Sequence, residues 1–125
     1  MFNEYQLKEI ELGILAGVDV SIYAKPEFSR GHMAQIRLGL AQGLDVSIYT
    51  KPEFDWWQMG EIRQGLVDGL DVSVYASLKF GWEQMQLIRE GLEQGLDVSV
   101  YAKPEFSRGQ MEQIRLRLWK EKNNV

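Results

Sequence analysis

The chain has 125 residues, of which 45% are hydrophobic and 26% are charged, and it contains no cysteine. This composition is typical of one globular domain, is too small for two independent cores, and excludes a disulfide framework and a thiolate zinc site. With 14 Lys and Arg against 18 Asp and Glu, the net charge of -4 provides no general attraction to nucleic acid or to an anionic membrane.

The first ten residues lack the basic segment and the apolar core of a signal peptide, and no stretch has the apolar length of a membrane span. We therefore expect a cytoplasmic protein without membrane contact. The pair Phe2-Asn3 aligns with Phe28-Ser29 farther along the chain, so Asn3 is the predicted N-cap of a first helix.

The segment GLDVSIYTKPEF at residues 43–54 recurs with small changes from Gly17, Gly69 and Gly95. Equivalent residues in successive copies are 26 positions apart. A fixed period of this length is typical of solenoids, whose repeats stack on their neighbours. We therefore predict an all-α fold, a short α-solenoid of about four to five such repeats, forming a single domain over residues 1–125.

Each repeat contains one amphipathic helix, because apolar residues such as Met33, Ile36 and Leu40 recur every three or four positions. A capping residue such as Ser29 precedes the apolar stripe, and a glycine such as Gly43 follows it. Long helices are thus predicted near residues 3–16, 29–42, 55–68, 81–94 and 107–122. Gly81 is a poorer cap for the fourth of them.

Between the long helices, Asp-Val-Ser-Ile/Val-Tyr predicts a short helix capped by its aspartate, near residues 19–24, 45–50, 71–76 and 97–102. An alternating strand is the other interpretation of Val-Ser-Ile-Tyr, and the pattern does not distinguish an α-helix from a 3₁₀-helix. Lys-Pro then ends the short element, because proline and the residue before it leave the helical region.

Two sets of equivalent residues change at the ends of the chain. Glycines lie inside four long helices, at a cost of about 1 kcal/mol each relative to alanine, whereas the fifth helix has Arg117 in that position. We infer that these glycines, Gly13, Gly39, Gly65 and Gly91, allow close approach of the next repeat.

An arginine occupies one position in every long helix except the first, which carries Glu11 there. We therefore predict that each arginine reaches back to the preceding repeat, with the aspartates that also cap the short helices as its partners. A ladder of arginines that binds phosphates is the alternative. The two sets are Arg37, Arg63, Arg89 and Arg115, and Asp19, Asp45, Asp71 and Asp97.

The candidate partner-binding residues vary while the rest of the repeat stays constant, and they lie beside the apolar stripe. They are Arg30, Trp56, Trp57, Gln64, Trp82, Glu83, Gln86 and Arg108. Tryptophan and arginine often dominate the energy of protein–protein binding. The alternative is local packing, in which a tryptophan in a first helical turn covers the Pro-Glu-Phe segment before it.

The sequence predicts no catalytic site, no metal site and no cofactor. Its one histidine, His32, stands where other repeats have glutamine, and no nucleophile is accompanied by a base. We therefore predict that the chain is not an enzyme.

The segments QIRLGL, GLDVSIY and AKPEFS resemble a repeat of uncharacterised proteins from gut Firmicutes and from their phages and mobile elements, over essentially the whole chain. The resemblance implies a phage or mobile-element setting, in which small proteins often inhibit host defence. We therefore expect a non-enzymatic module that binds a protein partner, such as a host defence protein, as a monomer or a weak end-to-end oligomer. Nucleic-acid or nucleotide binding through the arginines and tryptophans, and structural self-association, are the alternatives.

Overall fold

The computed structural model describes every residue from Met1 to Val125 and contains helices but no strand. The long α-helices are α1 (Glu4–Leu15), α2 (Arg30–Ala41), α3 (Trp56–Val67), α4 (Trp82–Glu93) and α5 (Arg108–Asn123). The short elements are 3₁₀-helices, η1 (Val20–Ile22), η2 (Val46–Ile48), η3 (Val72–Val74) and η4 (Val98–Val100). The predicted all-α repeat fold of the α-solenoid class is confirmed, and the strand interpretation of Val-Ser-Ile-Tyr is wrong.

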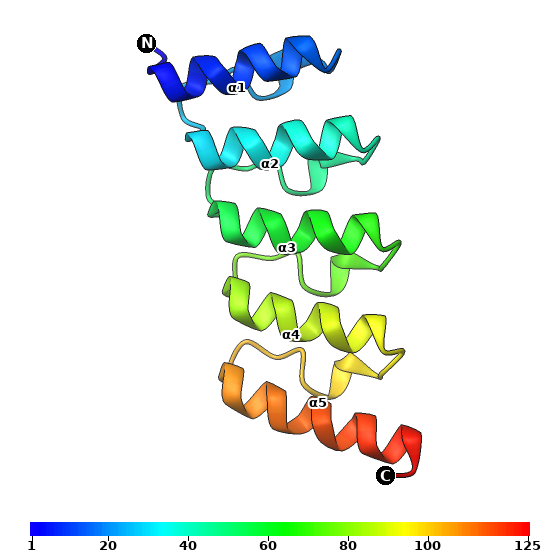
Figure 1. Cartoon of the computed structure of the whole chain (residues 1–125). Helices are drawn as coiled ribbons and strands as arrows, with labels where there is room; N and C mark the ends of the chain where they lie inside the picture. The colour runs from blue at the N-terminus through cyan, green and yellow to red at the C-terminus, as the bar shows by residue number, and fades with distance from the viewer. The chain divides into compact units, whose positions relative to one another are not determined.

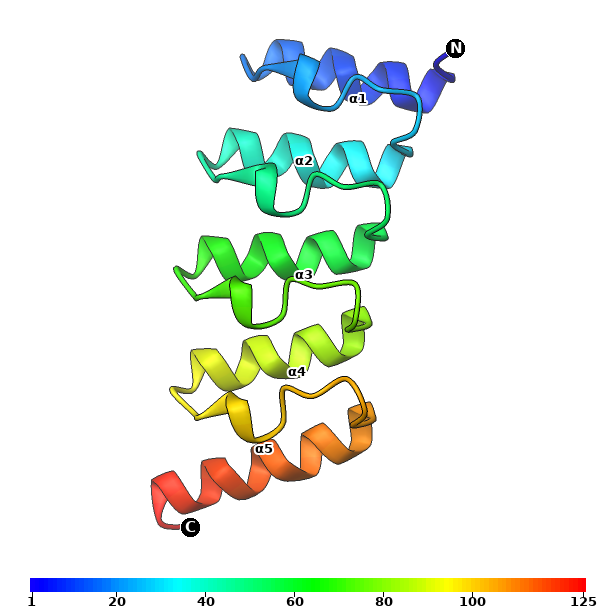
Figure 2. The ribbon, with the colours of Figure 1, turned by 180° about the vertical axis from the view of Figure 1, so that it is seen from behind.

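The chain divides into two compact units, Met1–Arg63 and Gln64–Val125. Within each unit, the long helices lie side by side, and the short helices and their loops lie on one side of them (Figures 1 and 2). The first unit contains α1, α2 and most of α3, and the second contains the end of α3 with α4 and α5. No helix combines the length and the apolar character that crossing a lipid bilayer requires.

The helix ends follow the local sequence signals. Asn3 Oδ1 accepts a hydrogen bond from the backbone N–H of Gln6 at 2.8 Å, and Ser107 Oγ accepts one from the N–H of Gln110 at 3.1 Å. Gly81 has no side chain to do this, so α4 keeps only the other half of the capping box, in which Gln84 Oε1 accepts from the Gly81 N–H at 2.9 Å. The glycines after the first four long helices have φ between 69° and 74°, the left-handed conformation expected of C-terminal caps.

A tyrosine after each short helix holds that element against its own long helix. The hydroxyl of Tyr49 donates to the carbonyl of Gln35 at 2.6 Å, and Tyr23 and Tyr101 make the same bond 14 residues back along the chain. A Cβ added to Gly39 would lie 2.1 Å from this hydroxyl and 2.7 Å from Val46 Cγ1. The interior glycines do permit close approach, but the approaching groups are a tyrosine and a valine of the same repeat, so the inference that the next repeat approaches them is wrong.

In α1 and α4, the glutamine near the start of the long helix also ties neighbouring repeats together. Gln6 Nε2 donates to the carbonyl of Phe28 at 2.7 Å, and Gln84 Nε2 donates to that of Phe106 at 2.7 Å. His32 replaces this glutamine: its Nε2 lies 2.6 Å from the Phe54 carbonyl, and its Nδ1 lies 3.1 Å from the Ser29 backbone N. Because a carbonyl only accepts and an N–H only donates, we assign the neutral tautomer protonated on Nε2.

Replacing Gly39 with alanine tests the packing of the tyrosine. We expect Gly39→Ala to lower the free energy of unfolding by about 1–3 kcal/mol, because the added methyl group overlaps the Tyr49 hydroxyl. The control is Gly60→Ala, whose new Cβ would approach nothing closer than Gln35 Nε2 at 3.4 Å and which should raise stability by up to about 1 kcal/mol. Urea unfolding measures both, and changes of the same sign in the two variants would contradict the expectation.

Alkaline pH tests the burial of the tyrosine hydroxyls. Burial raises the pKa of Tyr23, Tyr49 and Tyr101, with nearby arginines opposing the increase. Since the unfolded chain therefore releases these protons first, the free energy of unfolding should decrease as the pH rises above about 10, the ordinary tyrosine value. Tyrosinate absorbance and helical circular dichroism should change together, whereas ionisation of most tyrosines with full helix retention would contradict this.

Candidate binding surface around Trp56 and Trp57

The predicted partner-binding residues are distributed over both units. Arg30, Trp56 and Trp57 belong to the first unit, and the remaining five belong to the second. Arg30, Trp56, Trp57, Glu83 and Arg108 are exposed, whereas Gln64, Trp82 and Gln86 are half-buried. Within the first unit, Arg30 and Trp56 line one groove.

Trp56 and Trp57, at the start of α3, form a stacked pair of indoles. Their ring centroids are 4.0 Å apart and their planes differ by 26°. Adjacent residues on a helix normally diverge in direction, so this stacking requires space beside one of them. Gly31 provides the space, because a Cβ added there would lie 2.8 Å from Trp56 Cγ. Even so, the two tryptophans remain 42% and 49% exposed.

In three pairs of neighbouring long helices, the first residue of one helix contacts the second residue of the helix before it, 25 positions earlier. Trp56 packs over Gly31, and the guanidinium of Arg30 lies 5.2 Å from the ring centroid of Tyr5. In the second unit, Arg108 Nε lies 3.7 Å from Glu83 Oε2. Local packing between neighbouring helices therefore explains part of the sequence variation at these positions. Sequence comparison at a spacing of 26 residues missed these pairs, whereas comparison at 25 would have aligned them.

A shallow groove of about 390 Å³ lies beside the tryptophan pair in the first unit. Glu9 on α1 and residues of α2 form its walls, and Trp56 closes one side. The groove thus combines an indole surface with the guanidinium of Arg30 and the amide of Gln35, groups that suit a peptide or a protein loop. Its lining residues are Glu9, Arg30, Gly31, Ala34, Gln35 and Trp56.

Arg37 and Arg63 reach back to the preceding repeat, as predicted, but their partners are not the aspartates, whereas Arg89 Nη1 donates to Glu93 Oε1 of its own helix at 2.6 Å. Arg37 Nε donates to Glu9 Oε2 at 2.8 Å, and Arg63 donates to Gln35 Oε1 at 2.8 Å and to Gln42 Oε1 at 3.0 Å. These contacts use donors of both guanidinium groups within the fold, which favours a structural role over a phosphate ladder.

The aspartates cap the 3₁₀-helices instead. Asp45 Oδ1 accepts from the Ser47 hydroxyl at 2.6 Å and from the Ser47 backbone N–H at 3.1 Å. These two hydrogen bonds lower the pKa of Asp45 from its ordinary value. The prediction that aspartates pair with the arginines is therefore wrong for Arg37 and Arg63, because capping occupies the carboxylates.

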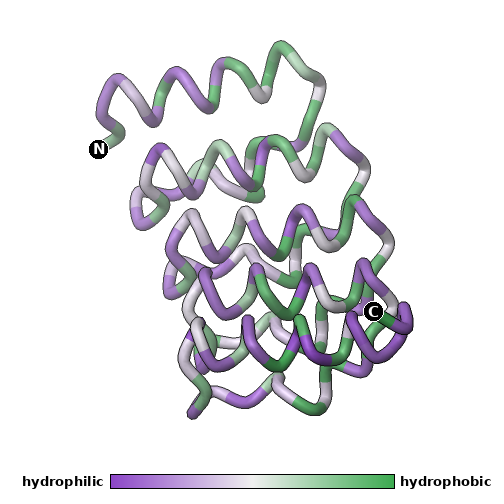
Figure 3. The backbone as a smooth tube through the Cα atoms, turned by 60° about the horizontal axis from the view of Figure 1, so that its bottom comes forward, coloured by the Kyte–Doolittle hydropathy of each residue, from purple (hydrophilic) through white to green (hydrophobic).

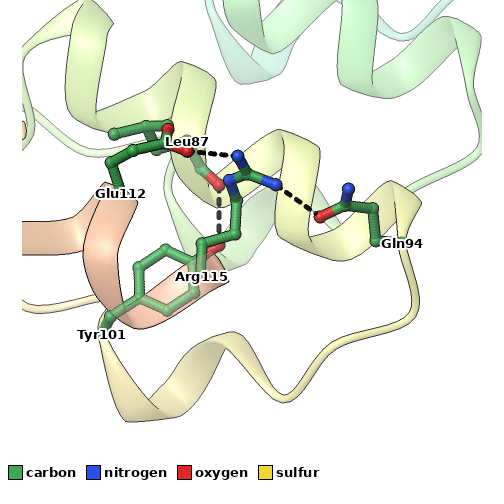
Figure 4. A network of polar contacts seen from close by, with 5 residues as sticks. All are labelled: Leu87, Gln94, Tyr101, Glu112 and Arg115. Carbon is green, nitrogen blue, oxygen red and sulfur yellow. Dashed lines mark hydrogen bonds and ion pairs between the residues drawn. The ribbon is translucent and has the colours of Figure 1, made fainter. Parts of the chain in front are cut away.

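Arg115 in the second unit is only partly satisfied. Its Nη1 donates to Gln94 Oε1 at 2.9 Å, and its Nη2 donates to Glu112 (Figure 4). Its Nε is buried without a hydrogen-bond partner, because Leu87 stands where the first unit has Glu9 or Gln35. The same arginine position therefore differs in its polar contacts between repeats.

The structure places no group of three or more His, Asp or Glu side chains so that they would hold a metal ion. Comparisons with family models, with curated proteins and with solved structures each found no match to this chain.

Two arginine variants test the unequal contacts. We expect Arg37→Leu to lower the free energy of unfolding by about 1–3 kcal/mol, because it leaves the Glu9 carboxylate, only 12% exposed, without its guanidinium. Arg115→Leu should have a smaller effect, because Arg115 already has an unpaired Nε and Glu112 is 31% exposed. Urea unfolding compares them, and a larger loss for Arg115→Leu would show that this reasoning is wrong.

Proposed function

We propose that the chain is a non-enzymatic helical-repeat module that binds a protein partner through Trp56, Trp57 and the adjacent groove. The observation that carries the proposal is the stacked indole pair, which remains about half exposed although a glycine has made room for it. Indole surface left in water is unfavourable, and covering it stabilises a complex. Tryptophan and arginine are also enriched among the residues that dominate binding energy.

The net charge of -4 and the inward-directed contacts of Arg37 and Arg63 favour a protein over a nucleic acid as the partner. A phage or mobile-element inhibitor of a host defence protein is the particular role that we propose within this class. That role rests on the resemblance of the repeat alone, since fold does not determine function.

The experiment compares capture of proteins from a bacterial lysate by wild type and by a Trp56→Ala/Trp57→Ala variant. Trp82 is left in place because it is half-buried. The matched control is Leu78→Ala, which removes an exposed apolar side chain in the second unit. Circular dichroism first establishes that all three proteins are folded, and every sample is divided and treated with or without nuclease.

We expect wild type and the Leu78 variant to capture a protein that the double variant does not capture. This result should be the same with and without nuclease. With this protein purified, the double variant should bind roughly 30-fold more weakly, as expected for the loss of about 2 kcal/mol at a binding hot spot. Equal affinity for the double variant would contradict the proposal, and capture abolished by nuclease would favour nucleic acid.

A further inference from the structure

The residues that line the groove beside Trp56 have more free hydrogen-bond donors than free acceptors. Glu9 Oε2 and Gln35 Oε1 each accept from an arginine of the fold at 2.8 Å. Gln35 Nε2, Trp56 Nε1 and the guanidinium of Arg30 make no hydrogen bond within the chain, and the free side-chain acceptor beside them is Oε1 of Glu9. The polar lining of the groove therefore suits a ligand that accepts hydrogen bonds.

Arg30 is exposed and has no carboxylate partner, unlike the arginine at the same position of α5. Its guanidinium lies over the ring of Tyr5, 5.2 Å from the ring centroid, and forms no ion pair. Arg108 instead has Glu83 at 3.7 Å, in the position that Tyr5 holds for Arg30. A guanidinium over an aromatic ring keeps the N–H donors at its edge free, and these can bind a carboxylate through two parallel hydrogen bonds. Arg30 therefore presents an unpaired positive charge at the groove.

Two small residues of α2, Gly31 and Ala34, leave space in the groove. In Figure 3, purple hydrophilic and green hydrophobic segments alternate along α1, the helix at the N mark, as expected of a helix with one polar face. At the two equivalent positions, α1 carries the large and exposed side chains of Tyr5 and Lys8. The other long helices also have a large side chain at one or both positions, namely Trp57, Glu83, Gln86 and Glu112. The groove volume of about 390 Å³ lies within the range of ligand sites, about 300–1,000 Å³.

A basic side chain is a poorer occupant of the groove than an acidic one. Glu9 is the only carboxylate in the lining, its side chain is 12% exposed, and it is already paired with Arg37 at 2.8 Å. An entering lysine or arginine would meet the positive charge of Arg30 and compete with Arg37 for Glu9, whereas a carboxylate would neutralise Arg30. Because the chain has a net charge of -4, this attraction acts at contact distance and does not steer a partner from far away.

We propose that the protein partner contributes an extended acidic segment to this groove, an inference that rests on the proposed function of the tryptophan surface. An aspartate or glutamate of the segment pairs with the guanidinium of Arg30. An apolar or aromatic side chain two positions away packs against Trp56, since such side chains lie on the same face of an extended chain. Backbone carbonyls of the segment accept hydrogen bonds from Trp56 Nε1 and Gln35 Nε2. The indole thus supplies apolar contact area, and Arg30 selects for the acidic residue.

The first test selects binders from a random dodecapeptide library by mRNA display, on wild type and on Trp56→Ala/Trp57→Ala in parallel. Peptides enriched on wild type alone should share an aspartate or glutamate within about two residues of an apolar or aromatic residue. Enrichment of basic peptides, enrichment without a shared acidic residue, or the absence of any peptide that distinguishes the two proteins would overturn the proposal.

The second test measures dissociation constants for the most enriched peptide, labelled with fluorescein, by fluorescence anisotropy. Arg30→Gln should weaken binding at least about tenfold, because it removes a charged hydrogen-bonded pair. Arg108→Gln is the matched control: Arg108 has the same repeat position and is exposed but already faces Glu83, so its dissociation constant should stay within about twofold of wild type. No loss for Arg30→Gln, or an equal loss for both variants with circular dichroism unchanged, would contradict the pairing.

A change in the peptide identifies the partner of Arg30. Replacing the acidic residue of the peptide with its amide should weaken binding to wild type about as much as Arg30→Gln does. The same peptide change should have little further effect on Arg30→Gln, because two changes to one ion pair are not additive. Additive losses would show that the acidic residue binds elsewhere and would overturn the proposal.

The acidic segment and the proposed function fail in different ways when Arg30→Gln is added to the lysate experiment. Loss of the captured protein from both Arg30→Gln and Trp56→Ala/Trp57→Ala would support both. Loss from the tryptophan variant alone would keep the proposed function and overturn the acidic segment. Normal capture by the tryptophan variant would overturn the proposed function, and the acidic segment with it.

Discussion

The repeat depends on one polar contact, the hydroxyl of a tyrosine that donates to a carbonyl of its own long helix across a glycine. The phenol ring is fully buried at Tyr23, Tyr49 and Tyr101, and the hydrogen bond removes the penalty of burying its polar end. The partner carbonyl lies only 14 residues away in the sequence, so closing this contact involves a short loop. Each repeat therefore contains the contact that gives it its shape, and the glycine in the helix is the condition for it.

Contacts between neighbouring repeats are of a second kind, and they tolerate more variation. The capping glutamine donates to a phenylalanine carbonyl of the next repeat, and His32 does the same with an imidazole in place of the amide. The arginine finds a carboxylate at Glu9 and an amide at Gln35, but a leucine at position 87 leaves Arg115 Nε unpaired. Such differences fit a solenoid, in which stability is a sum of similar contacts between neighbours.

The residues that vary most between repeats both pack against a neighbouring helix and remain partly exposed to solvent. A residue at the start of one helix contacts a suitable side chain on the helix before it. The guanidinium of Arg30 lies over the Tyr5 ring, and Arg108 lies beside Glu83. Packing against the preceding helix does not fully account for the tryptophan pair. Gly31 accommodates part of Trp56, but both indoles remain substantially exposed. Local packing and recognition are therefore combined in Trp56, and the exposed remainder is what supports a binding role.

Residue patterns alone established the period, the five long helices, their caps and the left-handed glycines, because these features depend on residues within a few positions of each other. They also indicated that glycine inside a helix admits a close neighbour and that the arginines reach back. The folded chain was needed to show which atoms meet: Arg37 with Glu9, Trp56 with Gly31, and a 3₁₀ rather than an α form for the short helices. These pairs are 25 or 28 residues apart, so their contacts depend on the rotation and separation of stacked helices, which a pattern read along the chain does not contain.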